Sequence, residues 1–193
     1  MKRVILPTNY SVPSPPQTAS TYFYTVSPNG SSTLNSLGVG TMRVAPWLVQ
    51  RPVSIARLGA EITSAGEAGS KLRIVLYADN GSGYPGALVV DAGQIAGDSA
   101  TVQELTVSAA PTFGLYWVGG IVQSVTTTQP TVRICSSWTP AVAVGAGTTL
   151  GTITAGGAVI CLSTTGITAA APSTFPAGAA GSGNMPRIFA RTA

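Results

Sequence analysis

Histidine is absent from this 193-residue chain, and few of its residues are charged: ten Lys or Arg and six Asp or Glu. Histidine is the most common general base near neutral pH and the most common metal ligand in proteins. Its absence excludes a Ser-His-Asp triad, a Cys-His catalytic pair and any metal site that depends on imidazole. We therefore expect a protein that is not an enzyme and that needs no cofactor.

Long apolar runs are also absent, since no stretch approaches the ~20 residues that a membrane-spanning helix needs. Lys2 and Arg3 precede a short apolar stretch, but Pro7 ends it well before it reaches the length found in signal peptides. The basic residues are scattered rather than gathered in a stripe among aromatic side chains. We expect no signal-peptide export, no membrane insertion and no nucleic-acid partner.

Proline and glycine are abundant instead, and the prolines of residues 1–52 lie among Ser, Thr and Asn. Because proline fixes its own φ and disfavours helix in the residue before it, this composition predicts an extended N-terminal arm that carries short strands. The aromatic residues Tyr22, Phe23 and Tyr24, together with Trp47 near the end of the arm, are predicted to contact neighbouring subunits. The alternative is an arm that packs on its own domain.

Beyond residue 52 the sequence alternates between apolar and polar residues, as half-buried strands do. Residues 55–62 and 71–77 show this period most clearly, and a loop of small and polar residues separates them. Short strands recur at similar intervals to the end of the chain, with turn residues between them. No segment combines helical spacing with capping signals over more than two turns. We predict an all-β fold in which residues 53–193 form an antiparallel β-sandwich of jelly-roll type.

The first two of these strands can be paired as a hairpin with an all-apolar inner side. In that register Glu61 faces Arg73 and Arg57 faces Tyr77 across the outer side, and each cross-strand pair contributes about 0.2–1 kcal/mol. The register fails if the two strands lie in different sheets. The scarcity of charge on the remaining strands predicts that other subunits cover much of their outer surface.

The segment 114–122 is apolar on both faces, which indicates a central strand that is covered on each side. Trp117 within it is predicted to be a core residue, and Gly119-Gly120 indicates a bulge or a close approach of another backbone. Cys135 and Cys161 lie in other apolar segments, where buried free thiols are favoured over a disulfide.

Few residues are candidates for catalysis, metal binding or sugar binding. A glycoside hydrolase would need two carboxylates that face each other across a cleft, and the sequence brings no two acids together. Asp79-Asn80-Gly81-Ser82 offers calcium one carboxylate where two or three are usual, so a turn is favoured there. Trp138, at a strand end, and Tyr84, in a turn, are candidates for stacking on a sugar, with core packing as the alternative.

Several short motifs, most of them between residues 55 and 122, carry a resemblance to a known family. They are Ala-Arg-Leu-Gly at 56–59, Thr-Ser-Ala-Gly-Glu-Ala-Gly-Ser at 63–70, Arg-Ile-Val-Leu-Tyr at 73–77, Asp-Asn-Gly-Ser-Gly-Tyr-Pro-Gly at 79–86, Asp-Ala-Gly at 91–93, Gly-Leu-Tyr-Trp at 114–117 and, more loosely, Pro-Arg-Ile-Phe at 186–189. Together they resemble a module of tail and other virion proteins of phages, notably phages that infect actinobacteria.

The resemblance implies a non-enzymatic β-sandwich that serves as a tail, fibre or capsid-decorating part of a virion. We expect other virion proteins as partners and a homo-oligomer such as a trimer or a ring, assembled in the host cytoplasm. One alternative is an adhesion module that recognises a glycan on the host cell surface. A remote alternative is a glycoside hydrolase that uses carboxylates.

Overall fold

The computed structural model describes residues 15–25, 32–135 and 161–193 of the chain. These residues form strands and no helix, and thus no helix that could span a membrane. The strands are β1 (Tyr22–Tyr24), β2 (Ser32–Asn35), β3 (Met42–Val49), β4 (Ile55–Ser64), β5 (Lys71–Asp79), β6 (Pro85–Ala96), β7 (Val102–Ala109), β8 (Gly114–Gln123), β9 (Thr131–Cys135), β10 (Cys161–Thr164), β11 (Ala180–Ser182), β12 (Met185–Pro186) and β13 (Phe189–Thr192). The predicted all-β fold is confirmed.

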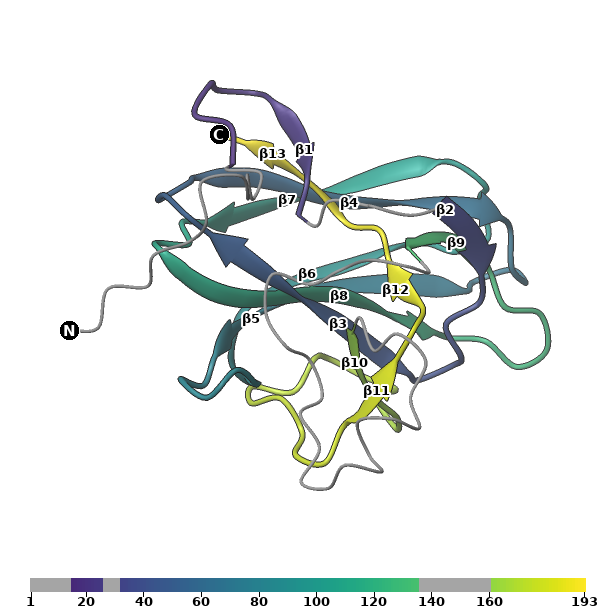
Figure 1. Ribbon diagram of the computed structural model, residues 1–193. Coiled ribbons are helices and arrows are strands. Elements are labelled where there is room, and N and C mark those ends of the chain that lie inside the picture. Colours follow the sequence, from purple (N-terminus) through teal and green to yellow (C-terminus); the bar gives the residue numbers. More distant parts are fainter. Residues whose placement is uncertain (1–14, 26–31, 136–160) are drawn as a thin grey trace.

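Strands β2 to β9 form two facing antiparallel sheets (Figure 1). One has the order β2-β9-β4-β7 and the other the order β3-β8-β5-β6. Along the chain, each of these strands crosses to the opposite sheet, except that β5 and β6 are neighbours in the same one. Eight strands arranged in this way are a jelly roll. The predicted β-sandwich is therefore confirmed, including its jelly-roll type.

The other strands widen both sheets. β10 and β11 continue one sheet beyond β3, which makes it six-stranded. The C-terminal segment joins the other sheet, because β12 pairs with β9 and β13 pairs with β4. β1 then pairs with β13, and this sheet is seven-stranded. β1 and β13, which are far apart in the sequence, thus lie side by side (Figure 1).

Part of the predicted arm belongs to the sandwich. Residues 32–35 and 42–49 form β2 and β3, which are integral to the jelly roll, whereas residues 1–14 lie outside the described residues. Pro46 argues against a central strand because it has no N–H to donate. β8 pairs with the whole of β3, but β10 pairs with Met42–Val44 alone, so Pro46 lies beyond the reach of that second ladder.

The predicted hairpin is wrong, because β4 lies in the seven-stranded sheet and β5 in the six-stranded sheet. The pairs Glu61–Arg73 and Arg57–Tyr77 therefore do not form. The alternation itself is confirmed on the inner side of β4, where Leu58, Ala60 and Ile62 are buried. Alternation specifies which side chains face the core, but it does not specify the neighbouring strand.

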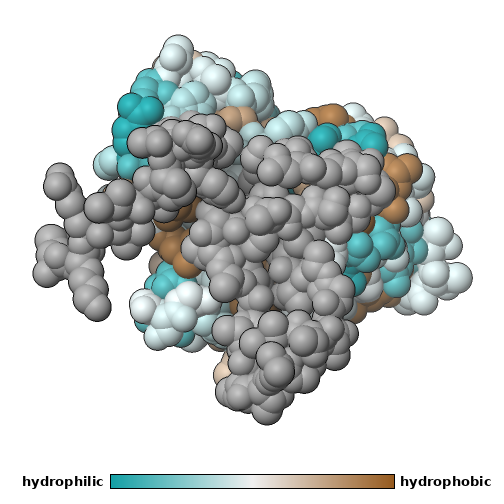
Figure 2. All heavy atoms as spheres, viewed as in Figure 1, coloured by the Kyte–Doolittle hydropathy of each residue, from teal (hydrophilic) through white to brown (hydrophobic). Residues whose placement is uncertain are grey.

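Two apolar clusters lie on opposite faces of the six-stranded sheet. Val118 and Val122 of β8 pack in the cluster between the sheets, and Trp117 and Ile121 pack in a second cluster on the outer face. The prediction of a central strand covered on both sides is thus confirmed, as is the core position of Trp117. On the side drawn in Figure 2, the described hydrophobic residues show as separate small areas among hydrophilic ones.

Gly119 shows why β3 and β8 can lie so close together. A Cβ atom at this position would lie 1.8 Å from the Arg43 carbonyl oxygen on β3, so no larger residue fits without moving backbone. The close approach predicted from Gly119-Gly120 is therefore confirmed.

Candidate functional site

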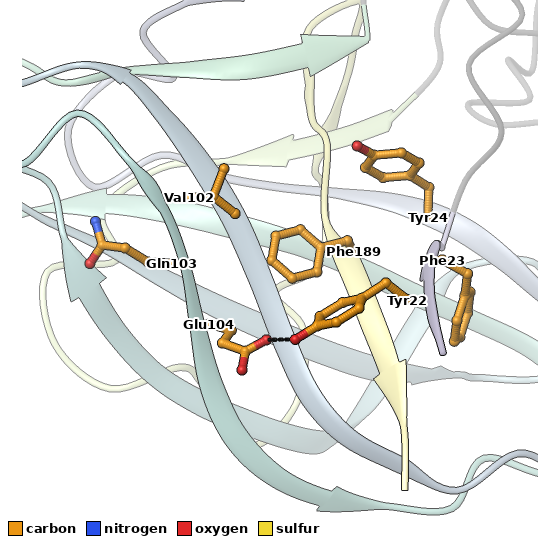
Figure 3. A pocket seen from close by; sticks show the side chains of 7 residues that line it. All are labelled: Tyr22, Phe23, Tyr24, Val102, Gln103, Glu104 and Phe189. Atoms are coloured by element: carbon orange, nitrogen blue, oxygen red, sulfur yellow. Dashed lines mark hydrogen bonds between the residues drawn. The ribbon is translucent and has the colours of Figure 1, made fainter. Parts of the chain in front are cut away.

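An open groove of about 490 Å³ crosses the outer face of the seven-stranded sheet (Figure 3). Strands β1 and β13 supply aromatic side chains on one side of it, and β7 supplies the other side. The lining residues are Tyr22, Phe23, Tyr24, Val102, Gln103, Glu104 and Phe189. Tyr22, Tyr24 and Val102 are among the exposed large hydrophobic residues of the described chain, and the fold gathers them at this one place.

Strand β1 positions the two tyrosines by simple alternation. Tyr22 and Tyr24 are two residues apart, so both point to the outer face, where they are 55% and 45% exposed. Phe23, between them, points toward the inner cluster, with its ring centroid 6.1 Å from that of Trp47. Trp47 itself is buried in that cluster, so its predicted role as a subunit contact is replaced by core packing. Of the four predicted subunit contacts, Tyr22 and Tyr24 are the exposed ones.

Phe189 forms the floor of the groove because Gly59 leaves room for its ring. Gly59 on β4 lies opposite Phe189 on one neighbouring strand and opposite Glu104 on the other. A Cβ atom on Gly59 would lie 2.2 Å from Cζ of the Phe189 ring. The Tyr22 ring meets Phe189 edge-on at a centroid distance of 5.9 Å, so the aromatic wall is continuous from β1 to β13.

Polar contacts fix the edges of the groove. The Tyr22 hydroxyl donates a hydrogen bond of 2.9 Å to Glu104, and Arg57 lies 3.6 Å from the same carboxylate. Arg187 lies over the Tyr24 ring at 4.5 Å, and Arg191 lies over the Tyr22 ring at 5.8 Å. Guanidinium groups stacked on tyrosine faces are attracted by the ring quadrupole and hold the rings in place.

Glu61 is the centre of a second ionic group on the same face. Arg133 donates two hydrogen bonds to its carboxylate at 2.9 and 2.7 Å, and Arg187 lies 3.5 Å away. The hydrogen bonds from Arg133 lower the pKa of Glu61 despite partial burial. The outward position predicted for Glu61 and Arg57 agrees with these contacts, but their partners come from β9, β7 and the C-terminal segment.

Arg73 and Tyr77, the other members of the predicted pairs, serve the six-stranded sheet. Arg73 Nη1 lies 2.7 Å from both carboxylate oxygens of Asp91, and Arg73 Nε donates to Gln123 at 3.0 Å. The Tyr77 hydroxyl donates to the Pro172 carbonyl oxygen at 2.9 Å, and burial raises the pKa of Tyr77 to about 12. These contacts hold the fold together and leave neither residue at the groove.

Of the two predicted sugar contacts, Tyr84 lies within the described residues. Tyr84 packs edge-on against Phe175 at 5.7 Å, and its hydroxyl donates to the Pro176 carbonyl oxygen and accepts from the Ala179 N–H. Its ring edge and hydroxyl are therefore used in packing, which was the alternative for this residue. Trp138 lies outside the described residues.

Asp79 organises the turn in which it lies. One of its oxygens accepts from the Gly81 N–H at 2.7 Å and from the Gly83 N–H at 3.3 Å, and the other accepts from Trp117 Nε1 at 3.1 Å. These bonds are those of the turn that the sequence predicts. Cys135 and Cys161 are buried free thiols, as predicted, and burial raises the pKa of Cys161 to about 11.

Sequence reasoning missed Phe189, Glu104 and Gly59 as groove residues. The alternation of Tyr22 and Tyr24 around Phe23 was the available signal, but nothing near Phe189 or Glu104 indicates that their strands flank β4. Glu104 is the one carboxylate among the lining residues, so the groove lacks the pair of acids that glycoside hydrolysis uses. What the groove offers is contact area: aromatic rings, arginine planes and one hydrogen-bonded carboxylate.

No protein-family model and no curated protein sequence matches this chain.

Proposed function

We propose that the protein is a non-enzymatic structural subunit of a phage virion, and that the aromatic groove on the seven-stranded sheet is one of the surfaces through which it assembles. Its partners are other virion proteins and further copies of itself in a trimer or a ring. The sequence resemblance over residues 55–122 supports a role in a virion, and the jelly-roll fold is consistent with that role.

The exposure of Tyr22 and Tyr24 is the observation that carries the proposal. Large apolar side chains gathered at one exposed place mark interaction sites more often than isolated ones do. Tyrosine and arginine are the residues that interfaces favour, because they bury much area and still make hydrogen bonds. The groove combines both types, with Arg187 and Arg191 stacked on the two tyrosines.

The pairing of charges supports the same conclusion. Glu104 is already bonded to Tyr22 and close to Arg57, and Glu61 is bonded to Arg133 and Arg187. A partner that covers this face therefore desolvates charges that are already compensated, which is cheaper than burying isolated ones.

The test is a rebinding assay on particles that lack the protein. Purified wild-type protein is expected to co-sediment with such particles, and a Tyr22→Ala, Tyr24→Ala double variant is expected to lose at least about tenfold in affinity, as the loss of interface anchors does. Phe113→Ala is the matched control, because Phe113 is an exposed aromatic residue outside the groove. The proposal is wrong if wild-type protein does not bind, or if the double variant binds as well as wild type.

A further inference from the structure

One arginine beside the groove has no acidic partner within the described part of the chain. The ion pairs on this face are Arg133–Glu61, Arg187–Glu61 and Arg57–Glu104. Arg191 belongs to none of them, although it lies over the Tyr22 ring that lines the groove. The two acids of this face are thus already taken by other arginines.

Arg191 also faces a second cation. It lies directly opposite Arg57 in the ladder between β13 and β4, and like charges in such a cross-strand pair repel each other. Arg191 Nε is buried and has no hydrogen-bond acceptor among the described residues. The Tyr22 ring, at 5.8 Å, attracts the guanidinium but does not neutralise it. The subunit by itself therefore leaves an uncompensated positive charge at the side of the groove.

An apolar surface lies two positions along the same strands. In the ladder between β13 and β4, Phe189 lies opposite Gly59, two residues from the Arg191–Arg57 pair. Phe189 and Val102 line the apolar part of the groove (Figure 3). Side chains two residues apart in a strand point the same way and are roughly 6.5 Å apart. An extended peptide that runs along these strands presents its own side chains at this spacing.

We propose that the groove binds an extended acidic segment of a neighbouring virion protein. An Asp or Glu carboxylate of that segment lies between Arg191 and Arg57, and an apolar side chain two residues away lies over Phe189. The inference rests on the proposed assembly role and adds the chemistry of the partner. A carboxylate at this place accepts hydrogen bonds from two guanidinium groups and removes the repulsion between them.

The number of free charges favours a peptide over a nucleic acid. One uncompensated arginine matches one carboxylate, whereas nucleic-acid binding rests on several phosphate contacts. The net charge of +4 on the whole chain also suits an acidic partner.

Rebinding of the full chain to particles that lack it tests the proposal. Arg191→Met keeps an apolar stem of similar length but removes the charge, and it is expected to lower the affinity at least about tenfold. Arg191→Lys restores the charge and is expected to recover part of that loss. Glu104→Gln removes the acid that competes for Arg57 and is expected to raise the affinity several-fold. Lys71→Met is the matched control, because it removes one positive charge from the six-stranded sheet.

Thermal melting of the isolated subunit separates a role in binding from a role in folding. Arg191→Met is expected to melt no lower than wild type, because the substitution removes a repulsive pair and a buried donor that has no acceptor. A clearly lower melting temperature would assign Arg191 to the stability of the fold and overturn the proposal.

Soluble poly-glutamate and poly-lysine identify the charge of the occupant. Poly-glutamate is expected to compete with the particles for the protein, and poly-lysine is not. Competition by poly-lysine alone would indicate a basic occupant, such as residues 1–14 of another copy with Lys2 and Arg3, and would overturn the proposal.

The inference and the proposed function can fail separately. If Arg191→Met binds as well as wild type while the Tyr22→Ala, Tyr24→Ala double variant does not, the acidic partner is wrong and the assembly role stands. If Glu104→Gln weakens binding as much as Arg191→Met does, the acidic partner is likewise wrong. Absence of wild-type binding overturns both.

Discussion

On the outer face of the six-stranded sheet, Tyr77 and Tyr84 pack beneath Phe175, and both hydroxyls bond to backbone of the same covering segment. On the outer face of the seven-stranded sheet, Tyr22 and Tyr24 lie open to solvent beside the groove. The described residues thus cover one face and leave a comparable aromatic face open. Tyrosines stabilise the fold on the first face, and on the second they are available to a partner.

The largest effect is expected on the covered face, from Phe175→Ala. Phe175 is 4% exposed and touches both Tyr77 and Tyr84, so its removal leaves a cavity beneath the covering segment. We expect the free energy of unfolding to fall by about 3–5 kcal/mol. Urea denaturation measures the change, with the exposed Phe113→Ala as the control. A loss as small as the control's would mean that the segment covers the sheet only loosely.

A smaller effect is expected from Asp91→Asn, which weakens the tie between the covering segment and the sheet. Asp91 accepts from Arg73 at 2.7 Å and from the Ala171 N–H at 3.1 Å. Burial disfavours its charged form, but these hydrogen bonds outweigh that effect and lower its pKa. We expect a loss of about 2 kcal/mol in urea denaturation. Glu104→Gln, on the open face, is the comparison and should cost less than about 1 kcal/mol.

Low pH is expected to lower the stability of the fold through Glu67, which lies in a loop outside both faces. The Glu67 carboxylate accepts hydrogen bonds from the backbone N–H groups of Thr126, Thr128 and Thr127, which lower its pKa from the ordinary 4.5 to about 2. Because the folded-state pKa is the lower one, this stabilisation is complete above pH 4.5 and is lost as the pH falls toward 2. In Glu67→Gln, the melting temperature should fall less steeply over that range. An unchanged slope would show that other carboxylates dominate.

The smallest stability effect is expected on the open face, from Tyr22→Ala. Tyr22 is 55% exposed, and the hydrogen bond that its hydroxyl donates to Glu104 lies at the surface. We expect a loss of no more than about 1 kcal/mol. Thermal melting measures it beside Phe175→Ala. A loss as large as that of Phe175→Ala would show that the aromatic groove is needed for folding, and the contrast between the two faces would disappear.

The alternation of apolar and polar residues predicted the strands well, because it depends only on residues within the same strand. The inward residues of β4, the two covered faces of β8 and the close approach at Gly119 follow from sequence positions that are near one another. Which strands pair with one another does not follow from such nearby positions. Glu61 meets Arg133 because the chain crosses between sheets at most of its turns, and a jelly roll gives no local sign of which strand returns beside which. Arg73 meets Asp91 across β5 and β6, the two consecutive strands that stay in one sheet.

The groove was only half predictable for the same reason. Tyr22 and Tyr24 are recognisable as a pair that points one way, but Phe189 reaches them only because β13 lies between β1 and β4. Gly59 leaves room for the Phe189 ring, and this role can be recognised only when β13 is known to lie beside β4.

Imaging of the intact particle, at a resolution that shows side chains, tests most directly whether the open face is the assembly surface. We expect a neighbouring subunit to lie over Tyr22 and Tyr24, with its side chains filling the groove. A particle in which this face points to solvent, while neighbours contact the covered face around Phe175, would contradict it.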